Sequence, residues 1–161
     1  MNILITGLVA TAVMDLWGLV RKPLLGWAVA DYRFVGRWVS GFSRGQFRHE
    51  AIGRSQDRHG EVAIGWVAHY LLGLVFAALL LAIVGADWIR RPALMPAMLF
   101  GLITVLVPFL VMQPAMGAGY AASRTPRPTA ARLQSLVTHA IFGLGLYAGG
   151  WAARFIQPTG V

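Results

Sequence analysis

Four long runs of apolar residues alternate with segments that hold most of the charges. Each run approaches or exceeds the length of about 20 residues that a helix needs to cross a membrane. Because a backbone inside lipid must satisfy its own hydrogen bonds, we expect each run to be a helix. The predicted spans are residues 3–20, 62–84, 94–117 and 133–156. The pattern predicts an all-α integral membrane four-helix bundle, forming a single domain over residues 1–161.

The composition is that of a membrane protein. Hydrophobic residues make up 57% and charged residues 12% of the 161 residues, whereas soluble domains carry about 25% charged residues. Cysteine is absent, which excludes disulfides, thiolate metal sites and cysteine nucleophiles. The first run lacks the basic start and the cleavage site of a signal peptide, so we expect it to remain as the first span.

The basic residues are distributed unevenly between the two ends of the spans. Eleven of the 14 Lys and Arg residues fall in the first and third connections, and three fall at the other ends. The positive-inside rule therefore predicts that these two connections are cytoplasmic. We expect a bacterial inner-membrane protein with both termini in the periplasm. The net charge of +8 is interpreted as contact with anionic lipid headgroups, not with nucleic acid.

The third connection concentrates basic residues before the last span. Pro128, followed by Thr129 as the expected N-cap, would direct free backbone N–H groups toward the cytoplasmic surface. We expect anionic lipid headgroups at this point, with a soluble phosphate or carboxylate as the alternative. The basic residues concerned are Arg124, Arg127 and Arg132.

The first connection, residues 21–61, begins with an amphipathic segment. Its residues Arg33 and Arg37 lie mostly away from the apolar face, and Asp31 is available as an N-cap. This pattern predicts one interfacial helix between the first two spans, lying on the cytoplasmic leaflet. The following residues, 43–61, are polar and interrupted by glycine, and we expect a solvated loop. The apolar face consists of Tyr32, Val35, Trp38, Val39 and Phe42.

Three polar residues lie at a common predicted depth in three of the spans. Asp15, His69 and His139 each fall about 7–11 Å from the cytoplasmic end, counted at about 1.5 Å per helical residue. Small residues flank each of them at helical spacing, which indicates that they face other helices. Gln113 reaches the same depth if the third span continues to residue 119. It lies close to Met112 and Met116.

This polar layer suggests a site that binds or passes a small ion, either a proton or a transition metal. Asp15, His69 and His139 supply ligands suited to a borderline metal ion, and Met112 or Met116 would favour Cu(I). At 161 residues, transport would call for a homodimer, with Gly145 and Gly149 as the expected contact.

Other interpretations of the layer remain open. The three polar residues could only link helices by hydrogen bonds. His69 and His139 could hold a haem b from two facing helices. The layer could also bind a lipid or another anionic molecule. A second metal site in the first connection is weighed against plain solvated surface, and its residues would be His49, Glu50, His59 and Glu61.

The third span carries two prolines. Pro108 and Pro114 remove backbone donors and free the carbonyls of Thr104 and Leu110, so we expect a kinked helix. No nucleotide-binding glycine loop, catalytic triad or nucleophile elbow is present in the sequence. The sequence therefore names no catalytic residue, and an enzyme is the less favoured class.

Three stretches carry a family resemblance: "GLVATAVMDLWG", "GWVAHYLLGLVFAALLLA" and "VMQPAMGAGYAASRTPRPTAARLQSLVTHAIFGLGLY". In these stretches the chain resembles a proteobacterial family of small inner-membrane proteins catalogued as domain of unknown function 2938. The resemblance covers nearly the whole chain and implies an integral inner-membrane protein without a known activity or cofactor. The residues that look family-like are Asp15, His69, Gln113, Arg124, Pro126 and His139.

Overall fold

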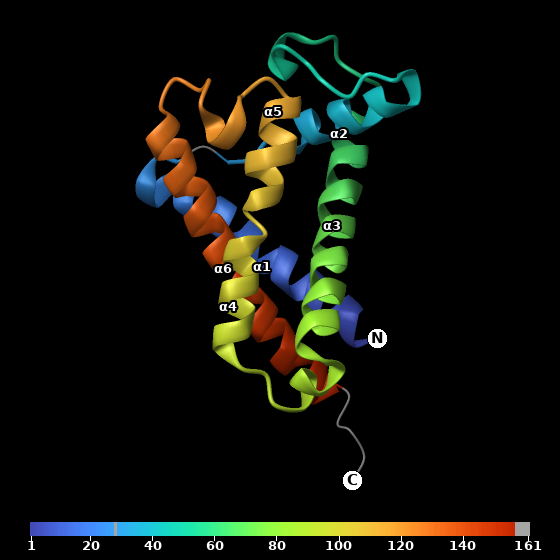
Figure 1. Ribbon diagram of the computed structural model, residues 1–161, viewed down its shortest axis with the longest axis vertical. Helices are drawn as coiled ribbons and strands as arrows, with labels where there is room; N and C mark the ends of the chain where they lie inside the picture. Colours follow the sequence, from blue (N-terminus) through green and yellow to red (C-terminus); the bar gives the residue numbers. More distant parts are fainter. Residues whose placement is uncertain (28, 157–161) are drawn as a thin grey trace. The chain divides into compact units, whose positions relative to one another are not determined.

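The computed structural model describes residues 1–27 and 29–156, and this part of the chain is helical without strands. Short 3₁₀ turns follow α2, α3 and the third span, and a π-helical turn precedes α5 (Figure 1). The helices are α1 (Asn2–Leu25), α2 (Tyr32–Gly41), α3 (Glu61–Val84), α4 (Leu94–Ile103), α5 (Gln113–Ala115) and α6 (Pro128–Ile156).

All four predicted spans are confirmed as helices that are long and apolar enough to cross a membrane. The helix ends differ from the prediction. Helix α1 continues past residue 20 to Leu25, through Arg21 and Lys22, because helical hydrogen bonding does not stop where hydropathy falls. Helix α6 starts at Pro128, so Thr129 lies inside its first turn and the predicted Thr129 N-cap is wrong. Proline suits a first helical position because that N–H has no helical partner.

The chain forms two compact units. The first contains residues 1–29, 70–104 and the chain from Leu136 onward, and the second contains residues 30–69 and 105–135. Helices α3 and α6 therefore each contribute to both units.

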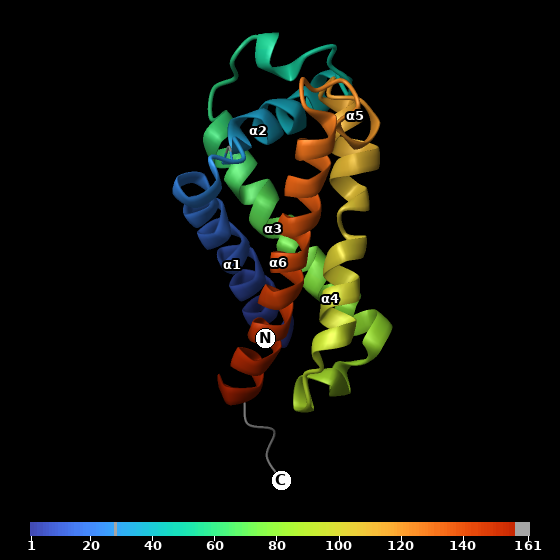
Figure 2. The same ribbon diagram turned by 90° about the vertical axis from the view of Figure 1, so that its left-hand side faces the viewer.

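In the first unit, α1 and α6 lie side by side in close contact (Figure 2). A Cβ added at Gly145 would lie 2.8 Å from Ala10 Cα, and one added at Gly149 would lie 2.8 Å from Thr6 Cα. Glycine is required at both positions because the backbones approach too closely for a side chain. The proposed homodimer contact through Gly145 and Gly149 is therefore wrong, since these glycines are buried against α1 of the same chain.

The opposite face of α6 meets α4 at a second glycine contact. A Cβ added at Gly101 would lie 2.5 Å from Gly143 Cα and 2.9 Å from the His139 carbonyl oxygen. Apolar side chains from α3 and α6 fill the core beside this crossing, where Phe76 and Phe142 meet edge to face at 5.9 Å. Helix α6 is thus fixed between two partners, and its His139 is held at the α4 contact.

The predicted kink in the third span is confirmed. Helix α4 ends at Ile103, and the next regular turn is a π-helical one at Pro108–Met112 (Figure 1). Pro108 has no N–H to offer the Thr104 carbonyl, which explains why the helix is interrupted just after Ile103. The boundary between the two compact units falls at this same point, between Thr104 and Val105.

In the second unit, α2 packs directly on the start of α3. A Cβ at Gly36 would collide with the Glu61 carbonyl, and one at Gly65 would collide with the Tyr32 carbonyl. The predicted N-cap is confirmed, because Asp31 Oδ1 accepts a hydrogen bond from the Arg33 amide at 3.1 Å. The amphipathic helix therefore exists, with its glycine face against α3.

One expectation about the first connection is wrong. Arg37 was expected among the outward polar residues of α2, but only 4% of it is exposed because it faces the turn before α3. The segment after α2 is largely exposed, as expected for a solvated loop, although Ile52 within it is buried. Backbone hydrogen bonds attach this segment to the end of α5, from the His49 amide to the Ala115 carbonyl and from the Ile52 amide to the Met116 carbonyl.

Candidate functional site

Asp15 belongs to α1 in the first unit. The contacts of α1 with α6 pair Thr6 with Gly149 and Ala10 with Gly145, so the two helices run antiparallel. Asp15 lies five residues beyond Ala10 on α1, whereas His139 lies six residues before Gly145 on α6 and its ring meets Thr104 at the α4 contact. Asp15 also hydrogen-bonds to Tyr70 of α3. Asp15 and His139 therefore belong to the same unit, and their common depth remains a prediction.

His139 is buried and its ring orientation is fixed by Thr104. The Thr104 hydroxyl donates to the Gly101 carbonyl at 2.5 Å and lies 2.8 Å from His139 Nδ1. A hydroxyl has one proton to donate, and here the carbonyl takes it. The Thr104 oxygen must then accept from Nδ1–H. The shorter contact with the Gly101 carbonyl favours the Nδ1–H tautomer of His139, in which Nε2 carries the lone pair that can accept a proton.

His69 belongs to the second unit, where Tyr32 covers it. The Tyr32 hydroxyl lies 2.9 Å from His69 Nε2, and the two rings stack with centroids 4.1 Å apart. Haem ligation through this nitrogen would require Tyr32 to leave, so the ring does not fit an axial ligand in its present arrangement. The shared depth of Asp15, His69 and His139 remains a prediction, because His69 lies in a different unit from the other two.

Gln113 begins α5 in the second unit. Its Oε1 is buried and has no hydrogen-bond partner within the described chain. Met112 precedes it in the π-helical turn, and the Met116 carbonyl accepts the Ile52 amide. Among the described residues, no group of three or more His, Asp or Glu side chains is placed to hold a metal ion. The geometry gives no support to a transition metal at Asp15, His69 and His139.

A buried arginine on α1, Arg21, is not among the site residues predicted from the sequence. Arg21 is 7% exposed and donates from Nη1 to the Thr138 hydroxyl on α6 at 2.7 Å. The predicted first span stops at residue 20, so Arg21 fell among the basic residues that were expected to contact lipid headgroups. Its position directly beside an apolar run was the signal available in the sequence.

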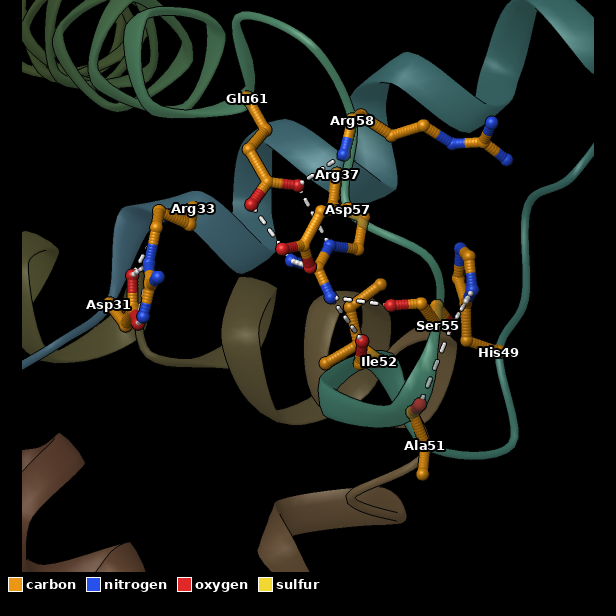
Figure 3. Close-up of polar contacts among 10 residues, drawn as sticks. All are labelled: Asp31, Arg33, Arg37, His49, Ala51, Ile52, Ser55, Asp57, Arg58 and Glu61. Atoms are coloured by element: carbon orange, nitrogen blue, oxygen red, sulfur yellow. Dashed lines mark hydrogen bonds and ion pairs between the residues drawn. The ribbon is translucent and has the colours of Figure 1, made fainter.

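A second missed feature is the set of contacts around Arg37, which we call the Arg37 cluster (Figure 3). Nε and Nη2 donate to the two Glu61 carboxylate oxygens, both at 2.8 Å. Nη2 also donates to Asp57, and Nη1 donates to the Ile52 and Ser55 carbonyls. All five N–H donors of the guanidinium are used. The cluster holds the chain from residue 52 to 61 against α2.

The second metal site considered in the first connection does not form. Glu61 is taken by Arg37 and by the Arg58 amide, and the His49 ring meets the Ser55 hydroxyl at 2.9 Å. His59 and Glu50 are exposed. These four side chains therefore serve separate contacts.

The basic residues of the third connection are partly engaged with the backbone. Arg132 Nε donates to the Ala121 carbonyl at 2.8 Å, and the Arg124 amide donates to the Ala118 carbonyl. Arg124 and Arg127 have exposed side chains, as a headgroup contact would require. Binding of anionic lipid here remains a prediction.

The chain belongs to the family described as "Protein of unknown function (DUF2938)", whose match covers residues 4–153. This confirms the family resemblance that the sequence indicated. Neither a curated protein nor a solved structure matches the chain. The family brings no assigned activity, and so the function is argued from the polar sites described above.

Proposed function

We propose that this member of the family is a multispan protein of the bacterial inner membrane that binds and passes a proton at His139 and Asp15. Four helices long and apolar enough to cross a membrane support the location. The excess of basic residues in the first and third connections supports a cytoplasmic position for these segments, with both termini in the periplasm. His139 and Asp15 then lie within the membrane, nearer its cytoplasmic side.

The observation that carries the proposal is the tautomer of His139. Because Thr104 accepts from Nδ1–H, Nε2 has its lone pair free to take up a proton. His139 as a whole residue is 8% exposed. Asp15 on α1 supplies a second ionisable group in the same unit.

A proton suits these residues better than a metal ion. Zinc sites use three or four protein ligands, and the part of the chain that the structure describes contains no such group. A proton needs one acceptor atom at a time. The Tyr70 hydroxyl forms a hydrogen bond with Asp15. This hydroxyl can also donate and accept a proton.

The test is proton flux into vesicles that contain the purified protein and a trapped pH-sensitive dye. A potassium diffusion potential drives the flux. We expect His139→Asn to abolish it, because asparagine still donates to Thr104 but has no titratable nitrogen. Asp15→Asn is expected to act in the same direction. His59→Asn is the matched control, since His59 is exposed outside the site.

A structural role is the second candidate, and a specific observation favours it. The polar groups have hydroxyl partners on neighbouring helices, as for His139 with Thr104 and His69 with Tyr32. If wild-type vesicles show no flux above empty ones, the proton proposal is overturned. If, in addition, the His139→Asn variant unfolds at a lower temperature than the wild type, the polar residues serve to link helices. Equal flux in the wild type and both site variants would overturn the proposal as well.

A further inference from the structure

A surface pocket of about 560 Å³ lies in the connection between α2 and α3. Its backbone is fixed at both ends, by the His49 amide on the Ala115 carbonyl at 2.7 Å and the Ile52 amide on the Met116 carbonyl at 3.0 Å. The Arg37 cluster holds the Ser55 carbonyl on the other side. The pocket is therefore built by the fold of the second unit. It is lined by Gln46, Arg48, His49, Glu50, Ala51, Arg54 and Ser55.

His49 contributes a buried hydrogen-bond donor without an acceptor. Its Nδ1 lies 2.9 Å from the Ser55 hydroxyl and 3.5 Å from the Gln46 amide nitrogen. An amide nitrogen only donates. The Ser55 hydroxyl oxygen lies closer to Nδ1, at 2.9 Å, than to its other acceptor, the Ala51 carbonyl oxygen, at 3.5 Å. Nδ1 is therefore the acceptor and Nε2 carries the hydrogen. Nε2 is buried with no partner among the described residues.

The charges of the lining favour an anion. Arg48 and Arg54 bring two guanidinium groups, and Glu50 brings one carboxylate. Burial lowers the pKa of His49, and the charges of Arg58 and Arg37 lower it further. His49 is thus a neutral ring at neutral pH, and its Nε2–H needs an oxygen acceptor. A ligand that carries several acceptor oxygens and negative charge would satisfy His49 and both arginines.

We propose that this pocket binds a phosphate oxyanion, with Arg48 and Arg54 on its oxygens and His49 Nε2–H as a third donor. Free phosphate and the phosphodiester of a lipid headgroup present the same oxygens. The proposal is independent of proton passage, because every lining residue lies outside the four membrane-spanning helices.

The first experiment follows the His49 ring by NMR in detergent-solubilised full-length protein. Inorganic phosphate is titrated in, with chloride at matched ionic strength as the reference. Saturable shifts of the His49 resonances and a higher His49 pKa are expected for a free phosphate ligand. A second series uses nanodiscs without inorganic phosphate. If the His49 resonances change in the same way when phosphatidylglycerol replaces phosphatidylcholine, the ligand is an anionic lipid headgroup.

Variants separate a built site from general charge attraction. Arg54→Gln removes a pocket donor, and Arg44→Gln removes the same charge from an exposed arginine of the neighbouring 3₁₀ turn outside the lining. We expect at least about tenfold weaker binding for Arg54→Gln, as the loss of a charge-assisted hydrogen bond implies. Arg44→Gln is expected to bind like the wild type.

Two outcomes would overturn the proposal. One is a His49 ring in the wild-type protein that responds to neither phosphate nor phosphatidylglycerol. The other is an equal loss of affinity in Arg54→Gln and Arg44→Gln, which would reduce the effect to net charge. The wild-type titration decides the question even if a variant fails to fold.

Discussion

Arg37 and Glu61 form a two-point ion pair, with Arg37 Nε and Nη2 each 2.8 Å from a Glu61 carboxylate oxygen. Both side chains are buried, with relative exposures of 4% and 8%. The pair joins the middle of α2 to the first residue of α3. The position of α2 on α3 therefore depends on a charge pair that is closed to solvent.

Glu61→Gln is expected to lower the free energy of unfolding by about 3 kcal/mol, because it leaves the Arg37 charge buried without its main partner. The measurement is denaturation of the purified protein, followed by circular dichroism. Arg33→Gln is the control, because its ion pair with Asp31 at 2.6 Å is largely exposed. Such surface pairs are worth about 0–1 kcal/mol. Equal losses in the two variants would contradict a special role for Arg37 and Glu61.

Gly101→Ala is expected to destabilise the first unit, because its Cβ would lie 2.5 Å from Gly143 Cα and force α4 away from α6. Gly18→Ala in α1 is the matched control. Its Cβ would meet only Val29 Cγ1, at 3.9 Å. The control should be neutral or stabilising by up to about 1 kcal/mol, because alanine favours helix. Thermal unfolding compares the two, and a Gly101→Ala protein as stable as Gly18→Ala would contradict the close α4–α6 contact.

The segment that carries His49 is expected to loosen in mild acid. The pKa of His49 is lowered from its ordinary value of 6.5 in the folded protein, so the unfolded segment binds a proton first as the pH falls. Stability from the neutral ring is fully present above about pH 6.5 and is lost as the pH falls through the lower folded pKa. Burial of the ring disfavours the added charge, and the charges of Arg58 and Arg37 repel it.

Limited trypsin digestion between pH 7.5 and 5.5, corrected for protease activity, measures this loosening at the arginines of residues 44–58. His49→Gln should remove the pH dependence because glutamine does not titrate in this range. A segment equally protected at both pH values in the wild type would count against the prediction.

Tyr32→Phe is expected to keep the fold and change the His69 ring. The phenyl ring can keep the 4.1 Å stack on His69, but the hydroxyl partner of Nε2 is lost. A cost of about 1 kcal/mol follows from the loss of one hydrogen bond. Tyr32→Ala removes the stack as well and should cost more. Imidazole NMR resonances together with denaturation midpoints test both, and an unchanged His69 spectrum in Tyr32→Phe would refute the bond.

The parts of the fold that depend on local sequence could be predicted. Hydropathy located the four long helices, Asp31 identified the N-cap of α2, and Pro108 located the break in the third span. Each of these follows from a few neighbouring residues and the chemistry of their backbone.

Relationships between distant residues could not be predicted in the same way. Arg37 meets Glu61 across 24 positions, and no local pattern tells which acidic residue an arginine will meet. The pair Gly145 and Gly149 signalled a close helix contact correctly, but the motif does not reveal whether the neighbour is another chain or α1. The common depth of Asp15 and His139 stays a prediction, and the hydroxyl partner of His139 follows only from the α4–α6 contact.

The full use of the five Arg37 donors limits how this position can change during evolution. Lysine keeps the charge but offers three donors from a single point, so it would leave at least two of the five acceptors without their bond. Gly36 and Gly65 bring the two backbones close enough for Arg37 to reach Glu61. We therefore expect relatives either to retain the residues at positions 36, 37, 61 and 65 together or to replace all four together.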